Sequence, residues 1–152
     1  MTRPILTVPH DVLRAVCAPV TAFDADLAAL TEEMFAAMYA APGRGLAAPQ
    51  IGVARRLFVM DATWKTGDRS PRICVNPEIV AQSEGLATHE EACLSIPRIA
   101  VTVDRPEWVT LRWQDLAGTV QEETFSGTEA VIVQHERDHL DGILCTDYAT
   151  LP

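Results

Sequence analysis

Long apolar segments are missing from this sequence of 152 residues. No run of about eighteen apolar residues occurs, which excludes an ordinary transmembrane helix, and the first ten residues lack the apolar core of a secretory signal. Basic residues are also few, since 12 Lys and Arg stand against 21 Asp and Glu, for a formal charge of -9. Phosphate backbones and anionic membranes are bound by clustered Lys and Arg. We therefore expect a cytoplasmic protein without direct nucleic-acid or membrane binding.

Cysteine is scarce, with only Cys17, Cys74, Cys93 and Cys145 in the chain. Four cysteines could form two disulfides, but the sequence has no secretory context, so we expect reduced thiols. For Cys17 and Cys74 we expect small, buried side chains. Repeats and low-complexity tracts are also missing, and the 48% hydrophobic content is typical of a globular protein. We expect one domain over residues 1-152.

Apolar periodicity predicts a helix near the N-terminus and another near the C-terminus. The first spans residues 24–39, where Leu27, Leu30, Met34 and Met38 recur at spacings of three and four. The second begins near Ser126, where Ser-Gly-Thr-Glu fits a capping box, and ends near Gly142.

Strands are predicted between the two helices. A loop rich in turn formers is expected at 41–52, a surface loop at 61–71, strands at 57–61 and 72–76, and a hairpin of 108–114 with 119–125 around a turn at 115–118. Strands first and a helix last, without regular alternation, predict an α+β fold in which short strands pack around a central C-terminal helix.

The predicted C-terminal helix carries a metal-binding pattern, His135-Glu136-Arg137-Asp138-His139. Residues four apart share one helix face, so His135 and His139 can converge on one ion. Glu136 beside them can take a proton from water and later deliver it to a leaving group. The alternative is a solvated helix with ordinary surface histidines.

A catalytic tetrahedral site needs a third protein ligand. Cys93, in Glu90-Glu91-Ala92-Cys93-Leu94-Ser95, is one candidate, and Cys145, which lies just behind the helix, is another. The remaining candidates are His10, His89, Asp141 and Asp147.

Three blocks in this order resemble the defining motifs of peptide deformylases. They are Gly45-Leu-Ala-Ala-Pro-Gln50, Glu91-Ala-Cys-Leu-Ser95 and Gln134-His-Glu-Arg-Asp-His-Leu140. The resemblance covers nearly the whole chain. It implies an amidohydrolase that removes the formyl group from the initiating methionine of new bacterial proteins, with a formylated peptide or nascent chain as its partner.

The resemblance also implies residue roles. Cys93, His135 and His139 would hold one divalent metal, with Fe2+ favoured in the cell and Zn2+ or Ni2+ possible, since these ligands suit several metals. Glu136 would be the general acid and base, and Gln50 and the backbone N–H of Leu94 would hold the oxyanion. Glu91 and Arg105 would pair and brace the cysteine-bearing strand, while substrate would be bound by Arg44, Gly45, Ala92 and Val131.

The sequence departs from the family pattern at three points. Arg44 replaces a usually aliphatic residue at the edge of the methionine pocket, which bears on substrate choice. Ala92 replaces a glycine before the metal-binding cysteine, which bears on turnover. The chain stops at Pro152, where many relatives continue into a basic helix that docks on the ribosome. We therefore expect ribosome contact to be transient at most.

Two other functions remain open from the sequence. One is a zinc protease of the His-Glu-x-x-His type with Gly142 in a matching place, although Cys145 stands where its third histidine would be. The other is a deformylase-like protein with altered substrate scope, or one that binds formylated peptides with little turnover.

Overall fold

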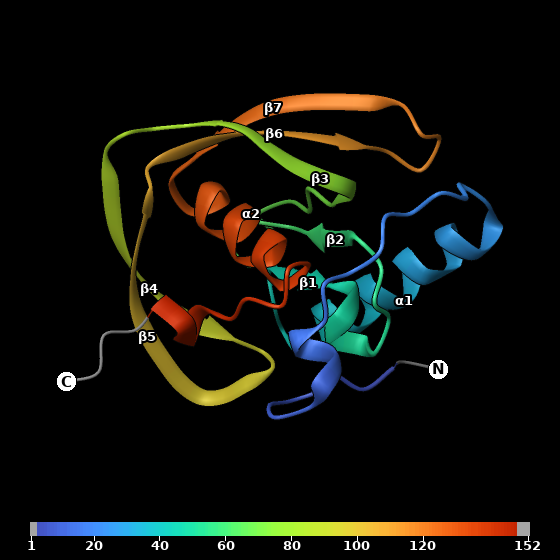
Figure 1. Cartoon of the computed structure of the whole chain (residues 1–152), viewed down its shortest axis with the longest axis horizontal. Coiled ribbons are helices and arrows are strands. Elements are labelled where there is room, and N and C mark those ends of the chain that lie inside the picture. Colours follow the sequence, from blue (N-terminus) through green and yellow to red (C-terminus); the bar gives the residue numbers. More distant parts are fainter. Residues whose placement is uncertain (1–2, 149–152) are drawn as a thin grey trace.

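The computed structural model describes residues 3–148, and these contain two long helices, seven strands and three short 3-10 helices. Figure 1 shows their arrangement. The helices are α1 (Ala25–Ala40) and α2 (Gly127–His139), and the short ones are η1 (Asp11–Arg14), η2 (Ala48–Ile51) and η3 (Cys145–Tyr148). In this part of the chain, neither helix is long and apolar enough to cross a membrane.

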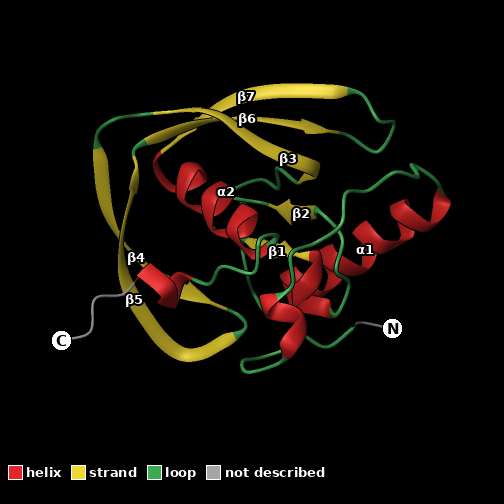
Figure 2. Cartoon of the chain, viewed as in Figure 1, coloured by secondary structure: helices red, strands yellow, loops and turns green. Residues whose placement is uncertain are grey.

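The strands form two antiparallel units (Figure 2). The larger sheet has the order β1-β2-β3-β6-β7, and β4 and β5 form a separate two-stranded hairpin. The bounds are β1 Gly45–Ala47, β2 Leu57–Met60, β3 Arg72–Gln82, β4 Leu86–Cys93, β5 Ile96–Pro106, β6 Trp108–Gln114 and β7 Val120–Ser126. The α+β class with a C-terminal helix among strands is confirmed.

Strand β2 is buried on both faces because each long helix covers one of them. Phe58 and Met60 belong to the cluster that includes Val133 of α2, whereas Leu57 and Val59 belong to the cluster that includes Met34 of α1. Alternate residues of a strand face opposite sides, so α1 and α2 lie on opposite faces of the sheet. Helix α2 is thereby held inside the molecule, together with its histidines.

Helix α1 agrees with its sequence pattern. Asp24 is the N-cap, and its Oδ1 accepts a hydrogen bond from the backbone N–H of Leu27 at 3.0 Å. The predicted apolar stripe is buried. A capped helix with one buried face is what that spacing requires.

Helix α2 differs from its prediction at both ends. Ser126 is its N-cap, but the Ser126 side chain makes no capping hydrogen bond, so the predicted capping box is wrong. The helix ends at His139, and one further turn leads to Gly142, whose φ is 73°. A Cβ at Gly142 would lie 2.5 Å from the carbonyl oxygen of Arg14, so close packing as well as the turn requires glycine there.

The strand predictions are correct in part. The hairpin of β6 and β7 is confirmed, and Asp115 fixes its turn by accepting hydrogen bonds from the N–H groups of Ala117 and Thr119. Residues 61–71 form an irregular loop, as predicted. The expected loop at 41–52 is wrong in detail, because it contains β1 and η2. Strand β3 continues to Gln82, well beyond its prediction.

All four cysteines are buried free thiols, which confirms the expectations for Cys17 and Cys74. Burial raises the pKa of the Cys17 thiol, so it is protonated at neutral pH. Both side chains belong to the hydrophobic core cluster that also contains Phe58.

Candidate metal centre

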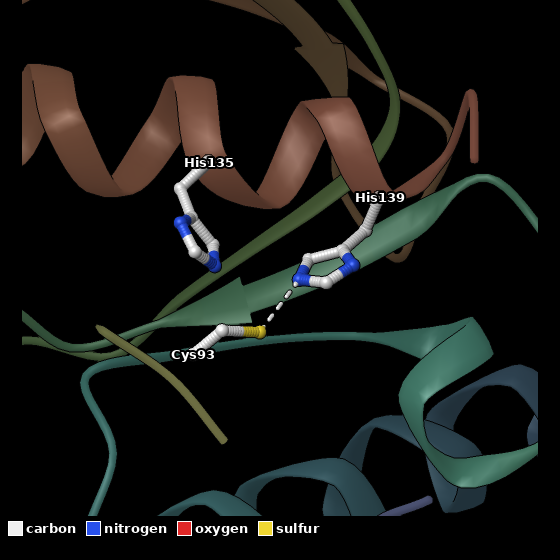
Figure 3. Close-up of side chains that lie close together, drawn as sticks. All are labelled: Cys93, His135 and His139. Carbon is white, nitrogen blue, oxygen red and sulfur yellow. Dashed lines mark hydrogen bonds between the residues drawn. The ribbon is translucent and has the colours of Figure 1, made fainter. Parts of the chain in front are cut away.

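Helix α2 and strand β4 bring three candidate ligands together. His135 and His139 lie one turn apart on α2, and Cys93 is the last residue of β4. Figure 3 shows the three side chains pointing toward one another. One potential ligand atom from each lies within 4.8 Å of the others, and all three residues are buried. The helical spacing predicted the two histidines, the family resemblance implied Cys93, and the fold brings the three side chains together.

The geometry fits a tetrahedral divalent ion. Metal–sulfur and metal–nitrogen bonds of about 2.3 and 2.05 Å at a tetrahedral angle place sulfur and nitrogen about 3.6 Å apart. In this protein, Sγ of Cys93 and Nε2 of His139 are 3.5 Å apart. One thiolate and two imidazoles are also a donor set that such ions accept. The three residues therefore fit a metal ion with one open position.

Glu91 fixes the orientation of His135. Its carboxylate accepts a hydrogen bond from Nδ1 of His135 at 2.9 Å, which leaves Nε2 for an ion. Arg105 donates two hydrogen bonds to the same carboxylate, of 2.5 and 2.9 Å. Burial opposes ionisation of Glu91, but Arg105 and His135 lower its pKa to about 2. The Glu91 carboxylate is therefore ionised at neutral pH while it is hydrogen-bonded to His135.

Asp138 extends this network, and its role was missed in the sequence. Arg105 donates to its Oδ2 at 2.9 Å, and the hydroxyl of Tyr148 donates to the same oxygen at 2.7 Å. The network thus connects η3, β5 and β4 to α2. Asp138 lies three positions after His135, so the helical spacing could have indicated that both side chains lie on neighbouring faces.

The two histidines have opposite electrostatic surroundings. Burial, and then the charge of His135, lowers the pKa of His139 to about 3, so His139 is neutral. Burial alone would also lower the pKa of His135, but Glu136, Cys93 and Glu91 raise it well above its usual value. The groups around His135 therefore favour a positive charge, which a metal ion supplies.

Glu136 is buried beside the ligands and lies against the backbone of Gly45. A Cβ at Gly45 would be 2.6 Å from its Oε2 and 2.9 Å from its Cγ, so any side chain there would displace the Glu136 side chain. Within residues 3–148, Oε1 of Glu136 has no hydrogen-bond partner. Burial raises the pKa of this carboxyl to about 7. A carboxyl with such a pKa is suited to both accept and donate a proton near neutral pH.

Gln50 presents its amide nitrogen to the site. Its Oε1 accepts from the backbone N–H of Ala47 at 2.9 Å, which fixes the orientation of the amide. Its Nε2 then lies 3.1 Å from Oγ of Ser95 and 3.8 Å from Sγ of Cys93. The side chain is thus a buried donor at the metal centre. Ser95 was not recognised in the sequence as its partner.

A cavity of about 1020 Å³ opens beside the ligands. The structure brings most of the predicted site residues to its wall. Those that line it are Arg44, Gly45, Gln50, Ala92, Cys93, Leu94, Val131, His135 and Glu136, whereas His139 is buried and does not line it. A pocket of this size can hold a peptide segment against the ligands.

The alternative third ligand, Cys145, lies in η3 and groups with Glu91 and His135. That grouping excludes His139 and requires Glu91, whose carboxylate Arg105 already holds. Burial raises the pKa of the Cys145 thiol, which disfavours the thiolate that binds metals. Cys93 is therefore the better third ligand.

Known proteins are similar to this chain throughout its length. The family described as Polypeptide deformylase matches residues 2–151. The peptide deformylase of Afipia carboxidovorans is 47% identical over 146 residues, which are 96% of this chain and 85% of that protein. The crystal structure of peptide deformylase from Thermotoga maritima has a TM-score of 0.93 and 38% identity, and covers 99% of both chains.

A third comparison concerns a structure with a bound peptide. The Met-Ala-Ser bound crystal structure of class I type b peptide deformylase from Acinetobacter baumannii has a TM-score of 0.90. It is 33% identical, and the match covers 97% of this chain and 98% of that one.

Proposed function

The chain belongs to the polypeptide deformylase family, and we propose that the site around Cys93 removes the formyl group from N-formylmethionyl peptides. The products are formate and a free amino terminus. The observation that carries this proposal is the convergence of three ligands, Glu136 and Gln50 at one pocket. The relative with bound Met-Ala-Ser supports a peptide that begins with methionine.

In this proposal Cys93, His135 and His139 hold one divalent metal. When bound, such an ion supplies an acidified water and polarises a carbonyl oxygen. We favour Fe2+ in the cell on the basis of the family resemblance, and Zn2+ or Ni2+ suit the same ligands. Glu91 keeps the His135 ring in the orientation that ligation needs.

Glu136 is the proton carrier of the reaction. Its carboxylate accepts a proton from the attacking water, and the resulting acid delivers it to the leaving amine. The pKa of about 7 permits both states. The position of the carboxylate against Gly45 holds it at the pocket wall.

Gln50 and Leu94 are the proposed oxyanion donors. The amide nitrogen of Gln50 and the backbone N–H of Leu94 would donate to the formyl oxygen as negative charge develops on it. Fixed donors of this kind stabilise the transition state because they need no reorganisation. The hydrogen bond from Ala47 to Gln50 supports that role, since it prevents the amide from turning.

Arg44, Gly45, Ala92 and Val131 are the proposed substrate contacts, since all four line the cavity. Ala92 lies in β4 between buried Glu91 and Cys93 and is itself exposed. Its methyl group is therefore directed away from the face that carries the ligand. The backbone of β4 stays accessible to an extended peptide.

We propose that the protein acts in the cytoplasm as one domain over residues 1-152. Four unbonded cysteines support a reducing compartment. The net charge of -9 supports transient contact with ribosomes at most. The partner is then a formylated peptide or nascent chain.

The test is an assay of formate release. Metal-loaded protein, kept anaerobic, is given formyl-Met-Ala-Ser and, as a control, acetyl-Met-Ala-Ser. We expect formate and free Met-Ala-Ser in equal amounts from the first peptide and no reaction with the second. Binding of the formyl peptide without formate release would contradict the proposed function and indicate a binding protein.

A further inference from the structure

Three basic side chains line the cavity of this acidic protein, namely Arg44, Lys65 and Arg98. In residues 3–148 none of them forms a salt bridge, whereas seven other arginines are each paired with a carboxylate. Five basic residues of this part of the chain have no salt bridge, and three of the five line this one pocket, whereas Arg55 and Arg69 do not. We call these three residues the cationic rim.

Arg44 is held at the pocket by its backbone. Its carbonyl oxygen accepts a hydrogen bond from the N–H of Asp61 at 2.8 Å. Its Nε is buried and has no hydrogen-bond partner among the described residues. A buried donor without an acceptor is energetically unfavourable. Arg44 Nε is therefore a hydrogen-bond donor that the described residues leave unused.

Lys65 is brought to the same place by the loop 61–71. The indole N–H of Trp64 donates to the carbonyl oxygen of Gly43 at 3.0 Å, which fastens this loop to the segment that carries Arg44. The carboxylate of Asp61 accepts from the N–H of Trp64 and so holds the loop from inside. The position of Lys65 thus follows from two fixed neighbours.

Arg98 projects from a bulge of β5. Ala92 pairs with Ala100 and Cys93 pairs with Ile96, so residues 97–99 have no partners on β4. Arg98 has a φ of 67°, which is rare for a residue other than glycine. Bulges beside active sites often redirect a side chain, and strained residues persist where the surrounding structure enforces them.

Few negative charges oppose the cationic rim. Glu90, Glu91 and Glu136 also line the cavity. The Glu91 carboxylate is bound by Arg105, and Glu136 is buried against Gly45. Of these three carboxylates that line the cavity, only that of Glu90 belongs to an exposed residue.

We propose that the cationic rim binds a substrate carboxylate, namely an acidic side chain within the two residues that follow the formylmethionine. This inference rests on the proposed deformylase function and specifies its substrate class. Three cations from separate segments line one pocket, and their combined positive potential attracts such a group. Peptides with Asp or Glu near the N-terminus are then preferred over those with isosteric amides.

The test compares formyl-Met-Glu-Ser amide with formyl-Met-Gln-Ser amide. We expect kcat/KM to be about three- to tenfold higher for the Glu peptide, the range of one or two partly screened charge pairs. Raising the salt concentration should reduce the ratio, because exposed charges are screened. Formyl-Met-Gln-Ser with a free C-terminal carboxylate tests whether the peptide C-terminus is the group that binds. If kcat/KM rises above that of formyl-Met-Gln-Ser amide for this peptide but not for the Glu peptide, the proposal is wrong.

Charge-neutral variants assign the effect to the rim. Lys65→Gln and Arg98→Gln change exposed side chains and should each reduce the ratio, while the combination with Arg44→Gln should bring it to about one. Arg55→Gln is the matched control, because Arg55 is exposed, lacks a salt bridge among the described residues, and does not line this cavity. The control should leave the ratio unchanged.

Two results distinguish a failure of the cationic-rim proposal from a failure of the proposed deformylase function. If both peptides are turned over at equal kcat/KM and the variants do not change this, the proposed role of the cationic rim is wrong. The proposed deformylase function is not affected by that result. If neither peptide is turned over, the proposed function fails, and calorimetry with Met-Glu-Ser amide and Met-Gln-Ser amide still tests the rim. Equal affinities for these two peptides would overturn it.

Discussion

Gly45 is the residue whose missing side chain defines the position of Glu136, because a Cβ there would lie 2.6 Å from Oε2. We predict that Gly45→Ala displaces this carboxylate and lowers kcat/KM about a hundred- to thousandfold. Metal content should stay near one per chain, since none of the ligands is touched.

Gly67→Ala is the matched control for that change. The nearest atom to a Cβ at Gly67 is 3.9 Å away, in a surface loop, so its kinetics should equal those of the parent protein. Parent-like kcat/KM in Gly45→Ala would show that Glu136 is not held at this position.

Gln50 is predicted to act on the transition state alone. Gln50→Ala removes one oxyanion donor and should lower kcat about a hundred- to thousandfold. The bound metal should be retained. Gln121→Ala, which changes an exposed hairpin side chain, is the control. Equal rates for both variants would rule out the oxyanion role.

Ala92 should restrain activity only mildly. It is not among the described residues with positive φ, and its side chain is exposed in the extended strand β4. We predict that Ala92→Gly raises kcat/KM on formyl-Met peptides by less than about tenfold, because an exposed methyl group has a smaller effect than the roughly 10- to 200-fold of one methylene group in an enclosed pocket. A larger gain would mean that the methyl group blocks the peptide path.

The chemistry of single residues was accessible from the sequence only where it depends on local spacing. His135, Glu136 and His139 follow from one helical turn. Lys65 and Arg98 could not be found, because a loop and a bulge place them and no spacing encodes either. Asp138 was also missed, since its partner Arg105 comes from a distant strand.

Among the structural elements, the loop 61–71 depends on one buried carboxylate. Asp61 is fully buried and accepts hydrogen bonds from the hydroxyl of Tyr39 and from the N–H groups of Thr63, Trp64 and Ser70. Asp61→Ala should lower the free energy of unfolding by about 2 to 4 kcal/mol, because these donors lose their acceptor. Chemical denaturation measures this change.

The same carboxylate predicts a pH dependence. Burial alone would raise the pKa of Asp61, but the hydroxyl of Tyr39 and the backbone N–H groups lower it below the ordinary value. Its contribution is therefore complete above the unfolded-state pKa of about 3.9, and is lost as the pH falls through the lower folded value. Asp68→Ala, an exposed change in the same loop, should affect neither stability nor its pH dependence.

Elements with a clear apolar period were predicted, and those held by polar contacts were not. Helix α1 and the β6–β7 hairpin follow from their patterns. In β4 the buried positions are Glu91 and Cys93, so no apolar alternation marks it. Strand β5 contains Pro97 and a bulge. These strands are stabilised by the Glu91–Arg105 ion pair, which the family resemblance implied but which no apolar pattern marks.

The proposed metal connects parts of the whole molecule, since Cys93 lies in the β4–β5 hairpin and the histidines lie in α2. Binding to the folded state alone stabilises it, by about 2.7 kcal/mol at a hundredfold excess over Kd. For a chain of this size we predict that chelation lowers Tm by about 5 to 10 °C. Calorimetry with and without chelator measures it.

His139→Ala provides the control for this whole-molecule effect. Because this variant lacks one of the three proposed metal-binding side chains, its Tm should not respond to added metal or to chelator. Elemental analysis of the variant should find little metal. A full metal content in both His135→Ala and His139→Ala would contradict the ligand assignment.

The most direct test of the proposed function measures metal content and formate release together in the parent protein and in Glu136→Gln. We predict about one metal per chain in both proteins, with formate released from formyl-Met-Ala-Ser at a rate at least a hundredfold lower in the variant. An equal rate in the variant, or no formate from the fully metal-loaded parent, would contradict it.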